Sequence, residues 1–127
     1  MGHEGTDQKC YDTIVEFAAR MGMIPLKLKK EQPGYILNSL LVPLLTSAQV
    51  LFANGVADFE TIDLTWRLAT GAPMGPFKIL DIVGLDTAYN IVSMNPLSKD
   101  QTSAHYKVVQ ILKEYIDNGK KGISTGE

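Results

Sequence analysis

Asn38 stands out among the side chains that are able to do chemistry, because it lies within a long apolar stretch. From Gln32 to Ala57 the chain contains no Asp, Glu, Lys or Arg. An amide donates and accepts hydrogen bonds without titrating, so Asn38 is suited to hold a reacting oxygen in place. It is equally suited to bridge backbone groups near Pro43, since buried polar groups are usually hydrogen-bonded. The residues alone favour this second interpretation.

The other candidates for chemistry are few. His3 and His105 are the only histidines, and their positions show no metal-ligand spacing. Cys10 is the only cysteine and has no histidine close by in sequence, so we interpret it as an inert thiol. A single cysteine excludes an internal disulfide framework and is typical of a reducing compartment, which predicts a cytoplasmic protein.

The composition narrows the class of partner. The chain has 127 residues, which suits one domain, and a net charge of −2. No basic field is available to hold phosphate backbones, so we expect no nucleic-acid partner. The uncharged stretch is long enough to cross a membrane, but polar residues such as Ser47, Gln49 and Asn54 interrupt it. We therefore expect no membrane partner either.

The first elements predicted on the path to Asn38 are a helix and a strand. Apolar residues at helical spacing predict a helix over 7–21, capped by Thr6 and ended by Gly22. Alternating apolar residues then predict a strand over 24–29. A single strand has no ladder to join, so it must pair with another chain, or the chain must be part of something larger.

The rest of the chain is predicted to be all-α. Asn38 lies near the start of a long helix over 34–54, and Pro43 is expected to kink that helix close to Asn38. Shorter helices are predicted over 59–69, 77–83, 87–94 and 104–117, with Asp58 and Asp86 as caps. A helix that is apolar on nearly all sides needs cover on all sides, which indicates a homodimer formed through the long helix.

Three separated blocks carry a family resemblance. They read "KEQPGYILNSLLVPLL", "ADFETIDLTWRLATGAPMGPFKILDIVGLDTAYNI" and "GKKGISTGE", and they occur in this order over nearly the whole chain. Together they resemble the C-terminal domain of NAD-dependent 3-hydroxyacyl-CoA (3-hydroxybutyryl-CoA) dehydrogenases. Ser39 departs from the pattern, because many relatives have arginine there.

The resemblance implies a fold and a division into domains. Residues 1–30 correspond to the last helix and strand of a Rossmann NAD-binding domain. Residues 31–127 correspond to a helical substrate-binding and dimerisation domain of the 6-phosphogluconate-dehydrogenase-like type. No G-x-G-x-x-G motif opens the chain. The resemblance therefore implies a C-terminal fragment, with NAD bound by the missing N-terminal domain.

The same resemblance reverses the interpretation of Asn38, because the asparagine at this position in relatives contacts the substrate and a catalytic histidine. It also implies that Pro73, Met74, Gly75 and Pro76 wall the acyl or pantetheine channel. The alternative for these four residues stays open, since Gly and Pro are common in helix–helix connections.

The implied reaction of the parent enzyme, in β-oxidation and butanoate metabolism, is hydride transfer between NAD and the 3-carbon of a short acyl-CoA. We expect the 127 residues alone not to catalyse it. Two alternatives remain: a stand-alone helical dimerisation or adaptor module, and a related two-domain dehydrogenase of another 3-hydroxy acid.

Overall fold

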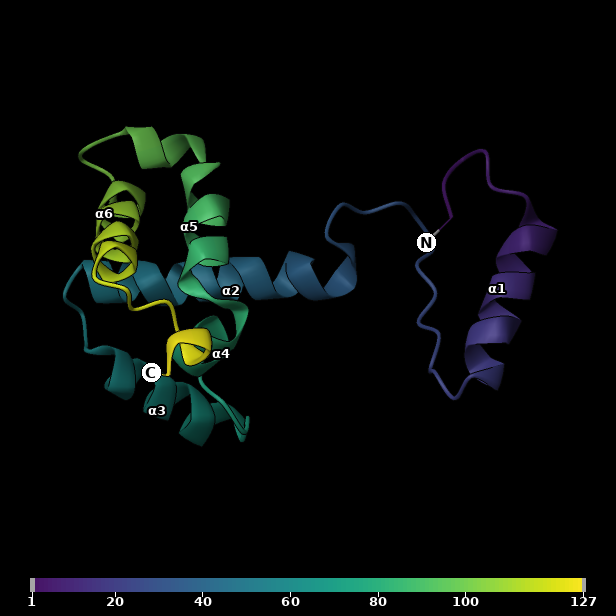
Figure 1. Ribbon diagram of the computed structural model, residues 1–127, viewed down its shortest axis with the longest axis horizontal. Coiled ribbons are helices and arrows are strands. Elements are labelled where there is room, and N and C mark those ends of the chain that lie inside the picture. The colour runs from purple at the N-terminus through teal and green to yellow at the C-terminus, as the bar shows by residue number, and fades with distance from the viewer. Residues whose placement is uncertain (1, 127) are drawn as a thin grey trace. The chain divides into compact units, whose positions relative to one another are not determined.

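The computed structural model describes residues 2–126, and all regular structure within them is helical. In chain order the elements are α1 (Gln8–Arg20), α2 (Tyr35–Ala53), α3 (Phe59–Thr70), α4 (Pro76–Val83), α5 (Leu85–Ser93), η1 (Pro96–Lys99), α6 (Ala104–Asp117) and η2 (Ile123–Thr125) (Figure 1). The chain divides into two compact units, Met1–Leu41 and Val42–Glu127, with the boundary inside α2. The all-α class predicted from the sequence is confirmed.

The first unit contains α1. Its N-cap is Asp7, whose Oδ1 accepts hydrogen bonds from the backbone N–H groups of Lys9 and Cys10 at 2.7 and 3.2 Å. The prediction of Thr6 as the cap was wrong by one residue. The Thr6 hydroxyl instead accepts the backbone N–H of His3 at 2.9 Å, which stabilises the turn before the helix. A carboxylate caps better than a hydroxyl because it carries charge toward the positive end of the helix dipole.

The strand predicted over 24–29 does not form among the described residues, and 23–28 carry no regular secondary structure. The reason is the lack of a partner strand. A strand is stabilised by hydrogen bonds to a neighbouring strand, and the described chain supplies no second strand to pair with. Ile24 and Leu26 are left 86% and 78% exposed, which is the condition of an unpartnered apolar segment.

The long helix α2 ends, as predicted, before Gly55, which adopts a left-handed φ of 69°. By length and composition α2 is apolar enough to cross a membrane, with a mean hydropathy of 1.7. Its two halves have different surroundings. Tyr35, Ile36, Leu37 and Leu40 in the first half are exposed, whereas the second half buries Leu45, Ala48 and Gln49 in the second unit.

The core of the second unit is built around α5 and α6, which lie side by side (Figure 1). Helical spacing places one apolar face of each helix against the other. The side chains that become most buried there are Leu85, Ala88, Val92, Val108 and Leu112. The predicted bounds of α6 agree with the structure, as do the cap of α3 by Asp58 and its end at Gly71.

The segment before η2 completes the second unit by holding the start of α5. The carbonyl of Lys121 accepts the backbone N–H of Leu85 at 3.1 Å, and Lys121 Nζ lies 3.2 Å from Asp86 Oδ2. The predicted cap role of Asp86 was therefore wrong: α5 begins at Leu85, and Asp86 lies in its first turn. A side chain inside the first turn cannot accept the same N–H groups as a residue that precedes it.

Candidate functional site

Asn38 lies on the exposed first half of α2. Its backbone N–H donates to the carbonyl of Gly34 at 3.1 Å, and a Cβ added to Gly34 would lie 3.1 Å from Asn38 Cβ. Gly34 and Tyr35 both have left-handed φ values, 77° and 54°. This conformation is rare for a tyrosine and lets the chain turn sharply into the helix.

The side chain of Asn38 is exposed within this chain. The interpretation of Asn38 as a buried amide that bridges backbone near Pro43 was therefore wrong. Leu37 before it and Leu40 two residues after it are each 68% exposed, so the amide lies on a turn of α2 whose apolar residues this chain leaves uncovered. An amide on such a surface is available to an occupant from outside the described residues.

The four residues predicted to wall a channel divide into two pairs. Pro73 and Met74 are exposed in the turn between α3 and α4, and they remain candidates for ligand contact. Gly75 and Pro76 are buried and form the start of α4. Asn38 belongs to the first unit, and these four residues belong to the second.

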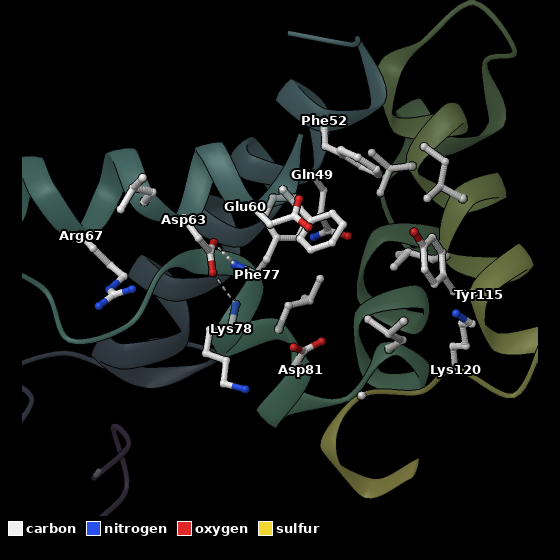
Figure 2. Close-up of a pocket in the computed structure, with 18 residues that line it drawn as sticks. Gln49, Phe52, Glu60, Asp63, Arg67, Phe77, Lys78, Asp81, Tyr115 and Lys120 are labelled. Atoms are coloured by element: carbon white, nitrogen blue, oxygen red, sulfur yellow. Dashed lines mark hydrogen bonds between the residues drawn. The ribbon is translucent and has the colours of Figure 1, made fainter. Parts of the chain in front are cut away.

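Asp63 explains why Gly75 and Pro76 are packed. Its carboxylate accepts the backbone N–H groups of Phe77 at 2.7 Å and Lys78 at 2.9 Å, so α3 caps the first turn of α4 (Figure 2). A Cβ added to Gly75 would lie 2.2 Å from Asp63 Cγ and 2.5 Å from its Cα. Only glycine permits this approach, while Pro76 at the first helical position needs no N–H partner.

A hollow of about 740 Å³ lies in the second unit, beside α3 and α4. Figure 2 shows the aromatic rings of Phe52 and Phe77 beside Gln49 in this hollow. Phe52, Phe59 and Phe77 form a cluster whose ring centroids lie 5.8 to 6.2 Å apart. Neither Asn38 nor the turn 73–76 is among the described residues that line the hollow.

The lining of the hollow also contains polar and charged side chains. Glu60, Arg67 and Tyr115 stand among its lining residues, which include no histidine or cysteine from the described part of the chain. Gln49 donates from Nε2 to the carbonyl of Leu45 at 3.0 Å, and its buried Oε1 has no hydrogen-bond partner in residues 2–126.

Sequence reasoning missed this hollow because its residues are distant in the chain. No local pattern links Phe77 to Phe52 or Tyr115. The available signal was the helical spacing of charged and apolar residues on α3.

The cap of α3 has a shifted pKa. Hydrogen bonds from the hydroxyl and the backbone N–H of Thr61 hold the pKa of Asp58 below its usual value, as expected for a capping carboxylate.

Dinucleotide phosphates are commonly held at a glycine-rich turn between a strand and a helix. Residues 2–126 form no strand and so no turn of this kind. Within the same residues, no three His, Cys, Asp or Glu side chains gather closely enough to hold a metal ion.

Solved structures that resemble this chain indicate its class of protein. The chain superimposes on a diketoreductase with a TM-score of 0.90 and 55% identity, covering 100% of this chain and 43% of that one. It also superimposes on (S)-3-hydroxybutyryl-CoA dehydrogenase from Ralstonia eutropha with a TM-score of 0.76, at 25% identity over 98% of this chain and 43% of that one. The fold is thus one found in oxidoreductases of carbonyl and hydroxyacyl compounds.

The family follows from the sequence comparisons. Residues 34–127 match the family model of the 3-hydroxyacyl-CoA dehydrogenase C-terminal domain. The chain is 39% identical to the mitochondrial hydroxyacyl-coenzyme A dehydrogenase of Homo sapiens, over 96% of this chain and 38% of that protein. It is 30% identical to the 3-hydroxybutyryl-CoA dehydrogenase of Bradyrhizobium diazoefficiens, over 94% of this chain and 40% of that protein.

The chain therefore belongs to the 3-hydroxyacyl-CoA dehydrogenase family, in which NAD is the general cofactor, and it spans about two fifths of the length of these relatives.

Proposed function

We propose that this chain supplies the acyl-CoA side of an NAD-dependent 3-hydroxyacyl-CoA dehydrogenase, with NAD bound outside the residues described. The observation that carries the proposal is the exposure of Asn38 on an apolar surface at the start of α2. In this role the amide donates to the oxygen on the 3-carbon of the substrate and orients it, while the exposed Leu37 and Leu40 exclude water. Pro73 and Met74 contact the acyl or pantetheine part. A cytoplasmic location, supported by the free thiol of Cys10, is part of the same proposal.

Binding experiments on the isolated chain test whether it binds acyl-CoA but not NADH. We expect calorimetric titration with acetoacetyl-CoA to show binding, and titration with NADH to show none, because residues 2–126 form no strand that could carry a glycine-rich phosphate-binding turn. Saturable quenching of Trp66 by NADH would contradict the second expectation.

A chimeric enzyme tests the role of Asn38. Residues 34–127 replace the matched segment of the Bradyrhizobium diazoefficiens relative, and turnover of acetoacetyl-CoA is measured. Asn38→Ala should lower turnover by roughly 10²-fold, the usual loss for one donor to a reacting oxygen. Asn54→Ala, at the other end of α2, is the matched control and should leave turnover unchanged. Near-full turnover in Asn38→Ala would contradict the proposed role of Asn38 in orienting the substrate oxygen.

A second candidate function is reduction of dicarbonyl compounds, the class of compound on which the similar diketoreductase acts. The higher identity to the diketoreductase structure, 55%, favours it. The same chimera separates the two candidates, because the relative kcat/KM for acetoacetyl-CoA and for a CoA-free diketo ester reports which substrate the helical portion accepts. The stand-alone adaptor alternative is not retained, since the family match argues for a part of an enzyme.

Self-association as a homodimer also belongs to the proposal. Exposed apolar side chains such as Leu51, Val56 and Leu64 in the second unit support it, because a monomer leaves them in water. The expectation that the long helix itself forms the interface loses part of its basis, because Leu45 and Ala48 in its second half are covered within the chain.

A further inference from the structure

The turn that leads into α2 holds a tyrosine in an unusual backbone conformation. Tyr35 has φ 54°, and within residues 2–126 it is the one residue other than glycine with a positive φ. This conformation is unfavourable for a residue that has a Cβ, so it persists only where surrounding contacts impose it. Tyr35 is 57% exposed, so core packing does not supply those contacts. The hydrogen bonds around the turn must supply them.

The turn is a β-turn, closed by the N–H of Tyr35, which donates to the carbonyl of Gln32 at 3.0 Å. Pro33 sets the second position and Gly34, with φ 77°, sets the third, which is the pattern of a type II turn. The backbone N–H of Asn38 donates to the carbonyl of Gly34, and a Cβ on Gly34 would lie 3.1 Å from Asn38 Cβ. The side chain of Asn38 therefore packs against the turn, and its direction depends on how the turn is held.

Ser39 ties this turn to the helix. Its hydroxyl donates to the carbonyl of Tyr35 at 2.5 Å, and its Oγ accepts a hydrogen bond from Nε2 of Gln32 at 3.2 Å. One hydroxyl thus joins the first and the last residue of the turn, and each of its two hydrogen bonds polarises the other. An arginine, which many relatives have at this position, contains no acceptor atom. The network is therefore a feature of this chain rather than of the family pattern.

We propose that Ser39 is a positioning residue for Asn38: by holding Tyr35 in the left-handed conformation, its hydroxyl fixes the turn against which the amide of Asn38 packs. The inference rests on the proposed role of Asn38 and adds the device that keeps its amide aimed at the substrate oxygen. Without the hydroxyl, Tyr35 relaxes toward negative φ, the turn moves, and the amide samples several directions. A displacement of about 1 Å is enough to lower turnover by about 10²-fold when the displaced group contacts the reacting atoms.

The first measurement uses the 127-residue chain without substrate, so it does not depend on the proposed function. Ser39→Ala should increase the picosecond-to-nanosecond mobility of the backbone amides of residues 34–38, seen as a fall in their heteronuclear NOE, and should shift the side-chain amide signals of Asn38. Alanine is the better helix former, so a weaker helix cannot explain this fall. Ser47→Ala is the matched control, because it makes the same change at an exposed position of the same helix and should leave these signals unaltered.

Turnover tests whether the effect passes through Asn38. The chimera described above is lengthened to residues 31–127, so that it includes Gln32. In it, Ser39→Ala should lower kcat about tenfold and change KM by less than about twofold, because the amide acts mainly in the transition state. In the Asn38→Ala background the same substitution should change kcat by less than about twofold, because no amide remains to be positioned. Ser39→Thr keeps a hydroxyl that reaches the carbonyl four residues back and should retain at least about half of the original kcat.

The outcomes separate this inference from the function on which it rests. Full turnover in Asn38→Ala overturns the role of Asn38 and, with it, the positioning role of Ser39. If Asn38→Ala loses turnover while Ser39→Ala does not, the positioning role alone is overturned. Equal losses from Ser39→Ala in both backgrounds indicate a purely structural residue and overturn it as well. Unaltered NOE values in Ser39→Ala have the same consequence, because other contacts would then fix the turn.

Discussion

Replacing Gly75 with alanine tests the packing of α3 against α4. Gly75 has φ −85° and ψ 169°, a conformation that any residue adopts, so its backbone does not require glycine. The space around Gly75 does require glycine. The added Cβ would lie 2.2 to 2.5 Å from the Cγ, Cβ and Cα of Asp63, where ordinary carbon contacts are about 3.5 to 4.0 Å. The start of α4 must therefore move away from α3 by about 1 Å or more.

The expected cost has two parts. Overpacking of this kind destabilises by about 1 to 3 kcal/mol. The same movement stretches the hydrogen bonds that Asp63 accepts at 2.7 and 2.9 Å, and loss of a helix cap costs about 0.5 to 2 kcal/mol. We therefore expect Gly75→Ala to lower the free energy of unfolding by about 2 to 5 kcal/mol, seen as a fall in Tm of about 10 °C or more.

Urea and thermal unfolding, followed by circular dichroism, measure the change. Gly71→Ala is the matched control, because Gly71 has φ 72° and no heavy atom within 4 Å of an added Cβ. Its cost is the strain of a left-handed alanine, about 1 to 2 kcal/mol. Asp63→Ala should cost less than Gly75→Ala, and the two together less than their sum, because both break the same cap.

The reasoning fails if backbone conformation rather than space decides the outcome. In that case Gly71→Ala would destabilise more than Gly75→Ala. A stability of Gly75→Ala within about 0.5 kcal/mol of the original chain would likewise show that α3 and α4 separate without cost.

Three further predictions concern the second unit. Hydrogen bonds from Thr61 lower the pKa of Asp58 in the folded state. The stability that Asp58 contributes is therefore present above its ordinary pKa of 3.8 and is lost as the pH falls through the lowered pKa. The Tm difference between the original chain and Asp58→Ala should vanish in strong acid. Gly122→Ala should cost about 2 to 4 kcal/mol in urea unfolding, because Gly122 has φ 102° and its added Cβ would lie 2.5 Å from the carbonyl oxygen of Asp81; a loss under 1 kcal/mol would contradict this. Gln49→Met should raise the unfolding free energy by about 1 kcal/mol by removing a buried acceptor without a partner, and a clear destabilisation would show that Gln49 Oε1 is satisfied in solution.

Local signals predicted the helices of the second unit well. Asp58 as a cap and Gly71 in the left-handed conformation bound α3, and both act through their own neighbours in sequence. The start of α5 was misplaced because its partner is distant: the carbonyl of Lys121 takes the N–H of Leu85. Such a contact leaves no pattern near residue 85, so the acidic Asp86 was mistaken for the cap.

Burial was harder to predict than secondary structure, and the two polar residues of α2 show why. Asn38 and Gln49 both lie in the stretch without charges, and periodicity treats them alike. The chain covers Gln49 with helices that follow it in sequence, whereas Asn38 belongs to the half of α2 that nothing in residues 2–126 covers. The strand predicted over 24–29 failed for the same reason, because its partner is not among the described residues. The hydrophobic pattern indicates which face of an element is suited to burial. It does not indicate whether the surrounding chain or a partner buries that face. The exposed apolar surface at Asn38 is therefore a place where the function of this chain should be sought.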